Sequence, residues 1–309
     1  MLLPFEIQQG FPTTVPNGKA EHLPRARKRQ RIVPSDLPSR HRLRLGDACD
    51  LSFLADESVH LVVTSPPYFN LKEYAPGNPR QLGDITDYDL FLDNLDRAWR
   101  ECHRVLVPGG RICCVAGAVN VARRQAGRHY VLPLPSDIQV RSRRLGLDNL
   151  TPIIWLKIGN IKLEASSSRR FLGKPNLPNG VIKNDFETIV MLRKPGGYRQ
   201  PTAEMEQQSR IENEDYFRWF TSTWSDITGA RTRAHPAPYP VDLAYRLIRM
   251  FSFAGDTVLD PFVGSGTTIR AAILAGRNSV GVEIEPLYIE LACRTNAALP
   301  FGVTLAVEA

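Results

Sequence analysis

Long apolar runs and paired cysteines are both missing from this 309-residue sequence. No stretch approaches the ~20 consecutive apolar residues that a membrane-spanning helix needs, so we expect no membrane span. The opening "MLLPFEIQQGFPTT" has no basic segment followed by an apolar one, which predicts no secretory signal. The five cysteines are scattered, and none stands in a Cys-x-x-Cys pair. This spacing argues against a disulfide framework and against a metal site, and it indicates a cytoplasmic protein.

The charge balance is basic. Lys and Arg number 39 against 32 Asp and Glu, which gives a formal net charge of +7. The hydrophobic fraction of 43% is close to the average for globular proteins and allows a sizeable core. A basic balance is consistent with a polyanionic partner such as nucleic acid, although many basic proteins bind none.

Residues 1–40 are rich in proline, glycine and polar residues and show no apolar period, which predicts a disordered arm. Five of the seven residues in "RARKRQR" (25–31) are basic, Arg27 and Lys28 among them. Such an arm would neutralise phosphates and add salt-dependent affinity without reading sequence. We expect residues 41–309 to form a single domain.

Strand-like and helix-like segments alternate from residue 41 onward. We predict strands at 41–45, 59–64, 111–117, 151–159 and 187–194, with helices at 48–55, 136–146 and 240–252. A further helix is predicted to begin near residue 87 and to be ended by Pro108-Gly109-Gly110. Residues 256–299 follow as strand, glycine loop, helix, strand and helix. This alternation predicts an α/β fold with a doubly wound, mostly parallel sheet. Two polar, irregular insertions interrupt it, near 159–184 and 195–235.

The glycine loop "LDPFVGSGTT" (259–268) follows a strand and opens a helix, as a nucleotide-type cofactor loop does. Glu283 ends the next strand, 23 residues after Asp260, where such folds place a ribose-binding acid. The spacing is not Gly-x-Gly-x-x-Gly, and the bulky Phe262 favours S-adenosylmethionine over NAD. The alternative is an ordinary turn with a solvated acid. The candidate ligands are Asp260, Phe262, Gly264, Gly266, Thr267, Thr268 and Glu283.

A second motif, "TSPPY" (64–68), ends the strand at 59–64. Alone, it would be a strand terminator with a packed tyrosine. Together with the glycine loop, the sequence resembles the permuted, β-type amino-methylating DNA methyltransferases, in which a Ser/Asp-Pro-Pro-aromatic motif precedes a Phe-x-Gly-x-Gly motif. The matching stretches are "TSPPY", "RVLVPGG" (104–110), "NDFETIVMLRKPG" (184–196), "HPAPYP" (235–240), "DPFVGSGTT" (260–268) and "VGVEIEPLYIELA" (280–292).

The resemblance implies a Rossmann-like, seven-stranded-type sheet in circularly permuted motif order, with S-adenosylmethionine as cofactor. It places Asp47 near the cofactor adenine and His235 near its methionine end. It implies double-stranded DNA as the substrate, and a cognate restriction endonuclease is a further partner to expect. Relatives occur as monomers and as homodimers. Such an enzyme would be cytoplasmic and associated with the nucleoid.

The catalytic residues that the resemblance implies are Ser65, Pro66, Pro67 and Tyr68. An exocyclic amine is a poor nucleophile, and acceptors such as the Ser65 hydroxyl and the Pro66 carbonyl would localise its lone pair. The two prolines fix the backbone that holds these acceptors. Tyr68 would stack on a flipped base. Serine at the first position favours N4 of cytosine over N6 of adenine, and the absence of Pro-Cys disfavours C5 of cytosine.

Target reading is expected in the irregular insertions, because arginine is the usual bidentate partner of guanine. The candidate DNA contacts are Arg169, Arg170, Lys174, Arg231 and Arg233, each of which could equally touch phosphate. Residues 68–84 are expected to close over the flipped base. The remaining alternatives are methylation of RNA, a catalytically silent nucleic-acid-binding regulator and an NAD-dependent oxidoreductase.

Overall fold

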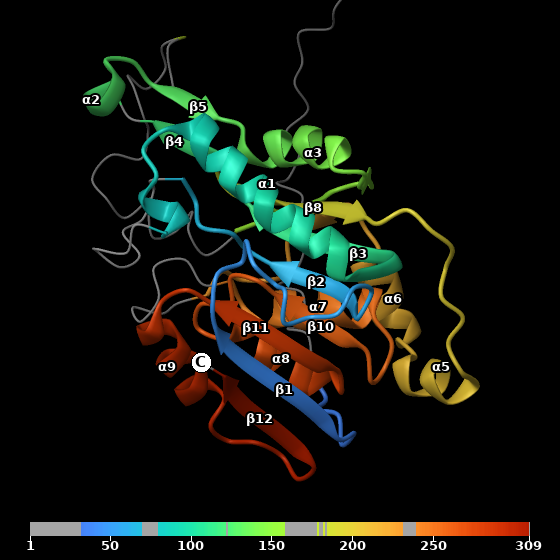
Figure 1. Cartoon of the computed structure of the whole chain (residues 1–309). Coiled ribbons are helices and arrows are strands. Elements are labelled where there is room, and N and C mark those ends of the chain that lie inside the picture. Colours follow the sequence, from blue (N-terminus) through green and yellow to red (C-terminus); the bar gives the residue numbers. More distant parts are fainter. Residues whose placement is uncertain are drawn as a thin grey trace, which may run out of the picture.

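One sheet of ten strands forms the centre of the computed structural model, which describes residues 32–69, 80–121, 123–157, 178, 182, 184–230 and 239–308 (Figure 1). The strand order is β12-β1-β11-β10-β2-β3-β8-β7-β9, and β6 also pairs with β8. The strands are β1 (Ser39–Leu45), β2 (Val59–Thr64), β3 (Leu106–Ala116), β6 (Asp148–Asn149), β7 (Ile153–Leu156), β8 (Phe186–Arg193), β9 (Thr223–Trp224), β10 (Thr257–Asp260), β11 (Asn278–Glu283) and β12 (Val303–Glu308). A separate hairpin joins β4 (Val119–Val121) to β5 (Tyr130–Leu132).

The path β1-β11-β10-β2-β3-β8-β7 is the predicted doubly wound, seven-stranded arrangement, with β12 and β9 added at its two ends. Neighbours from β12 to β3 are parallel, whereas β8 runs antiparallel to both β3 and β7. The order reverses between β10 and β2, because β10 leads to β11 on one side and β2 leads to β3 on the other. Ligands of doubly wound proteins bind at the carboxyl ends of the strands at such a reversal.

Helices cover both faces of the sheet. Figure 1 shows α1 lying across the front of the sheet, with α7 and α8 behind it. The helices are α1 (Tyr88–Val105), α2 (Arg123–Ala126), α3 (Leu134–Arg144), α5 (Ala203–Ser209), α6 (Asn213–Trp219), α7 (Val241–Phe251), α8 (Thr267–Ala275), α9 (Pro286–Thr295) and the short 3-10 helix η1 (Leu82–Asp84). In the part of the chain that the structure describes, no helix is both long enough and apolar enough to cross a membrane.

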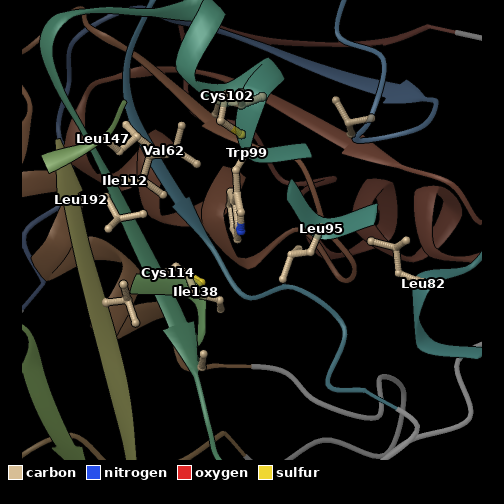
Figure 2. Close-up of a cluster of buried hydrophobic side chains, with 14 of the residues drawn as sticks. Val62, Leu82, Leu95, Trp99, Cys102, Ile112, Cys114, Ile138, Leu147 and Leu192 are labelled. Atoms are coloured by element: carbon tan, nitrogen blue, oxygen red, sulfur yellow. The ribbon is translucent and has the colours of Figure 1, made fainter. Parts of the chain in front are cut away.

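The alternation of side chains along β2 divides the core into two layers. Val62 belongs to the cluster beneath α1 and α3, whereas Leu61 and Val63 belong to the cluster beneath α7 and α8. In the first cluster Trp99 of α1 is fully buried and lies between strand and helix side chains (Figure 2). Because both faces of β2 are covered, its carboxyl end is held firmly at the middle of the sheet.

Two predicted helix boundaries are wrong. Residues 48–55 form turns rather than a helix, because Leu51 and Leu54 are buried and their carbonyls accept hydrogen bonds from Arg104 at 2.8 and 3.0 Å. The helix predicted to run up to Pro108-Gly109-Gly110 already ends at Val105, and these three residues lie within β3. The β2–β3 register shifts at this point, so the proline and glycines form an irregularity in the strand instead of a loop.

The region 195–235 is less irregular than predicted, since it contains α5, α6 and β9. Trp219 and Trp224 are 2% and 1% exposed and pack in the cluster with α7. Arg246 of α7 is buried and donates to both carboxylate oxygens of Asp226, at 3.1 and 2.8 Å. Residues up to 230 therefore extend the core. The predicted arm also ends earlier than residue 40, because Ser35 already bonds α8 and β1 begins at Ser39.

Candidate functional site

Four neighbouring parallel strands, β1, β11, β10 and β2, end at a cavity of about 590 Å³. Seven of the residues predicted from the sequence line this cavity: Asp47, Ser65, Pro66, Pro67, Phe262, Gly264 and Glu283. They come from segments as far apart in the chain as β1 and β11. The fold unites them because parallel strands direct all their carboxyl ends to one edge of the sheet.

Ser65 follows β2 directly, and its Oγ donates a hydrogen bond to the Tyr68 hydroxyl at 3.4 Å. Ser65 and the two prolines face the cavity, but Tyr68 does not line it. The Tyr68 side chain is 8% exposed and packs in the cluster beneath α1. Ser65 and the two prolines of the motif therefore line the cavity, whereas its aromatic ring lies in the core.

Glu283 at the end of β11 is 8% exposed and fastens the glycine loop to this strand. One carboxylate oxygen accepts from the Gly264 N–H at 3.0 Å, and the other accepts from the Ile284 and Glu285 N–H groups at 3.0 and 3.1 Å. Gly264 has a φ of 49°, in the left-handed region that glycine adopts most readily. Burial raises the pKa of Glu283 to about 7, against the lowering effect of these three amides.

Asp260 was predicted to bind the cofactor, but the structure places it beneath the loop, 1% exposed and outside the cavity lining. Its carboxylate accepts from the Thr64 hydroxyl at 2.7 Å, the Tyr239 hydroxyl at 3.0 Å and the Phe262 N–H at 3.1 Å. The Thr268 hydroxyl donates to the same carboxylate and also contacts the Tyr239 hydroxyl. Burial raises the pKa of Asp260. Asp260 thus joins the residue before Ser65 to the glycine loop.

Thr268, Thr267 and Gly266 were also predicted as cofactor ligands, and none of them lines the cavity. The Thr268 side chain is 1% exposed and is occupied by Asp260 and Tyr239. Gly266 has a φ of 82°, and a Cβ on it would lie 2.6 Å from Nδ2 of Asn296. This glycine therefore allows the start of α8 to pack against the end of α9.

The cavity has further walls that the sequence motifs did not indicate. Arg80, Gln81 and Leu82 form one wall, and the Gln81 side-chain amide donates to Glu285 at 3.2 Å. Residues 68–84 were predicted to close over a base, and residues 70–79 of that segment lie outside the described part of the chain. Ile284 and Tyr288 form another wall. Their nearness to Glu283 in the chain could have indicated them, whereas no local pattern indicated Gln81.

The predicted DNA contacts and His235 lie outside the described residues; these are Arg27, Lys28, Arg169, Arg170, Lys174, Arg231, Arg233 and His235. Described residues on either side of the recognition insertion near 159–184, and Tyr239 after residue 238, can be placed in the fold. β7 ends and β8 begins at the carboxyl end of β3, and Tyr239 contacts Asp260 at the carboxyl end of β10. Leu156, Phe186 and Tyr239 therefore lie at the edge of the sheet that holds the cavity.

The residues present fit S-adenosylmethionine. Two acids, Asp47 and Glu283, offer acceptors for amino and hydroxyl groups. Phe262 adds an aromatic ring to the cavity lining, and this ring makes a T-shaped contact with Trp99. The positive φ of Gly264 brings backbone to the cavity wall without a side chain.

Comparison with known proteins agrees with this fit. The family model of the N6/N4 DNA methylases matches residues 59–294. The Type II methyltransferase M.MjaI of Methanocaldococcus jannaschii is 34% identical, over 82% of this chain and 90% of its own length. The Type II methyltransferase M.MthZI of Methanothermobacter thermautotrophicus is 35% identical, over 81% of this chain and 75% of its own length. A solved candidate DNA modification methylase of Thermus thermophilus, complexed with S-adenosyl-L-methionine, is 50% identical, covers 87% of this chain and 98% of its own, and has a TM-score of 0.72.

Proposed function

We propose that this chain, which belongs to the N6/N4 DNA methylase family and is an S-adenosylmethionine-dependent DNA methyltransferase, methylates N4 of cytosine at a specific DNA sequence. The observation that carries the choice of cytosine is Ser65, a hydroxyl rather than a carboxylate, at the cavity wall where β2 ends. The Type II methyltransferases among its relatives support a sequence-specific enzyme that acts beside a restriction endonuclease.

In the proposed mechanism the protein activates and orients the amine. The Ser65 hydroxyl and the Pro66 carbonyl accept from the amine N–H groups, so the lone pair is drawn out of conjugation with the ring. These acceptors are preorganised, because two prolines and a buried strand fix their backbone. S-adenosylmethionine, when bound, supplies an electrophilic methyl group. The amine gives up its extra proton after the transfer, and no strong general base is required.

We assign the cofactor to the cavity lined by Asp47, Phe262, Gly264 and Glu283. Glu283 accepts from the ribose hydroxyls while it holds the loop, and Asp47 accepts from the adenine amine. The target base enters from the side of Ser65 and Pro66. Stacking of that base on Tyr68 would require the contacts that bury the tyrosine ring to open. Our proposed contacts to the target DNA remain those expected from the sequence, namely Arg169, Arg170, Lys174, Arg231 and Arg233.

The product of the reaction tests the choice of base. After incubation with labelled S-adenosylmethionine and DNA of mixed sequence, digestion to nucleosides should yield labelled N4-methylcytosine, identified by mass. The chain offers Ser65→Asp as a comparison, which places the carboxylate of the other motif class at the same wall. Recovery of N6-methyladenine from the wild-type reaction would overturn the assignment to cytosine. Label in RNA but not in DNA would contradict the DNA substrate.

The affinity for S-adenosylmethionine should depend on pH through Glu283. The pKa of about 7 means that the carboxyl carries a proton below pH 7 in the free protein. Ribose hydroxyls donate more strongly to the ionised form, so the proton must leave on binding and affinity should rise as pH increases. We expect the apparent Kd to fall nearly tenfold per pH unit from pH 5.5 to 6.5 and to level off by about pH 8.

Titration calorimetry at four pH values measures this dependence. Glu283→Gln should flatten the profile, whereas Glu290→Gln, the same change on the exposed face of α9, should leave it unchanged. A profile in the Glu283→Gln variant that still follows the wild type would show that another group titrates.

A further inference from the structure

A second cavity, of about 1160 Å³, lies at the amino edge of the sheet, opposite the carboxyl edge that holds Ser65. It is bordered by His60 at the start of β2, by Pro108–Arg111 in β3 and by Asp256 just before β10. The end of α7 and residues between 198 and 216 complete its walls. We call it the amino-edge cavity. No step of methyl transfer uses it.

The lining of the amino-edge cavity carries an excess of positive charge. Arg111, Arg199 and Arg249 line it, against one acid, Asp256. Asp256 is 3% exposed and is occupied by Arg199 and by the Phe253 N–H, which donates to it at 2.8 Å. Among the described residues, Arg111 and Arg249 have no acidic partner within 4.0 Å. Two guanidinium charges of the cavity are therefore left without a counter-charge in this part of the chain.

The same two arginines hold donors without acceptors. The Nε atoms of Arg111 and Arg249 are shielded from solvent and donate to no acceptor in the described part of the chain. Arg249 satisfies another of its N–H groups by donating to the Arg210 carbonyl at 2.6 Å. A buried donor without a partner costs ~1–3 kcal/mol, and native proteins leave few of them. Because both Nε atoms are closed off from solvent, a ligand in the cavity would meet the terminal N–H groups of these guanidiniums instead.

Aromatic rings lie beside these charges. The Arg111 Cζ is 4.9 Å from the centroid of the Phe251 ring, and the Arg199 Cζ is 5.3 Å from that of Phe253. Tyr216 also lines the cavity and belongs to the same aromatic group, stacking on Phe220, which packs on Phe251. A ligand could therefore place a charged group on the guanidiniums and a flat group on the rings.

We propose that the amino-edge cavity binds a small organic phosphate that carries a flat ring, of which a mononucleotide is the simplest example. The phosphate meets the guanidiniums of Arg111 and Arg249, whose N–H edges suit the oxygens of a phosphate better than a lysine ammonium would. The ring lies against Phe251 and Tyr216. The amino-edge cavity and the carboxyl edge that holds Ser65 lie at opposite ends of the strands, so target DNA bound at Ser65 is not this ligand.

Calorimetric titration of the full chain with uridine 5′-monophosphate tests the proposal. Saturating S-adenosylhomocysteine is present throughout, so that the cofactor cavity is filled. We expect saturable binding of one nucleotide per chain. Ribose 5-phosphate, which lacks the ring, and uridine, which lacks the phosphate, should each bind at least tenfold more weakly.

Variants locate the site. Arg249→Gln and Arg111→Gln should each weaken nucleotide binding about tenfold or more, which corresponds to at least ~1.4 kcal/mol. Arg249→Lys, which keeps the charge but loses the planar guanidinium, should show an intermediate loss. Arg144→Gln, the same change on the exposed face of α3, should bind as the wild type does. Turnover on DNA should stay within twofold in all four variants.

Several results would overturn the proposal. These are the absence of saturable binding, an equal loss of affinity in Arg144→Gln, and unchanged affinity in both Arg249→Gln and Arg111→Gln. Displacement of the nucleotide by short duplex DNA would likewise count against it, because the cavity would then belong to the DNA footprint. If Arg249→Gln proves unstable to heat, Arg249→Lys and Arg111→Gln still decide the outcome.

Discussion

Replacement of Ser65 with alanine is expected to lower the rate of methyl transfer about 100-fold, the usual effect of deleting one preorganised polar group at a reacting centre. Ser65 lines the cavity directly after the end of β2, where the proposed function places the target amine. Without it, the Pro66 carbonyl alone would accept from the amine, and the lone pair would stay delocalised into the ring. Single-turnover assays with labelled cofactor measure this rate directly.

Cofactor affinity separates this role from a structural one. Among the described residues, the Ser65 side chain makes one hydrogen bond, at 3.4 Å to Tyr68, so its loss should leave folding and S-adenosylmethionine binding nearly unchanged. Ser136→Ala, the same change on the exposed face of α3, is the matched control and should keep full turnover. If Ser65→Ala lost cofactor affinity in parallel with rate, the hydroxyl would be a cofactor ligand and the proposed role would be wrong.

Replacement of Asp260 with alanine should have the largest effect on stability, about 3–5 kcal/mol, which is typical of breaking a buried polar network. Asp260 is 1% exposed, and its loss leaves the hydroxyls of Thr64, Tyr239 and Thr268 and the Phe262 N–H without their acceptor. Each unsatisfied buried group costs ~1–3 kcal/mol. For a chain of this size the melting temperature should fall by roughly 6–15 °C.

Asp260→Asn distinguishes a structural acid from a cofactor ligand. The amide keeps an oxygen for Thr64 and for the Phe262 N–H, and hydroxyl groups can turn to accept from its nitrogen. Because burial raises the pKa of Asp260, a neutral side chain of the same shape should be tolerated at a cost of about 1 kcal/mol. Cofactor affinity should change less than twofold. A loss of affinity much larger than the loss of stability would restore Asp260 as a direct ligand.

Local motifs predicted residues that the structure brings together around one cavity. Ser65, Phe262 and Gly264 follow a strand that the apolar pattern predicts, Glu283 ends one, and all four line the cavity. Parallel strands bring their carboxyl ends to one edge, so a motif that follows a strand is placed by the topology alone. For the same reason, the predicted doubly wound sheet was confirmed even though two helix boundaries were wrong.

The directions in which side chains point at the strand ends could be learned only from the tertiary structure. Asp260 and Thr268 belong to the same motif as Phe262, yet they point beneath the loop and bond Thr64 and Tyr239, which lie 196 and 21 residues from Asp260 in the chain. Sequence spacing does not reveal such directions, because they depend on which distant donors reach the same buried point. The packing of residues 203–230 against α7 is similar, since it rests on three separated apolar residues, Trp219, Trp224 and Ile227.

The sequence by itself determined that this protein has an α/β fold, binds S-adenosylmethionine and methylates DNA, because short motifs at strand ends carry that chemistry wherever the topology brings them together. Only the tertiary structure decided which residues of those motifs face the cavity and which support it. It also revealed the amino-edge cavity, whose residues Arg111, Arg199 and Arg249 share no motif. The physical reason is that burial and side-chain partners arise from long-range packing, whereas strand order and loop position follow from local pattern.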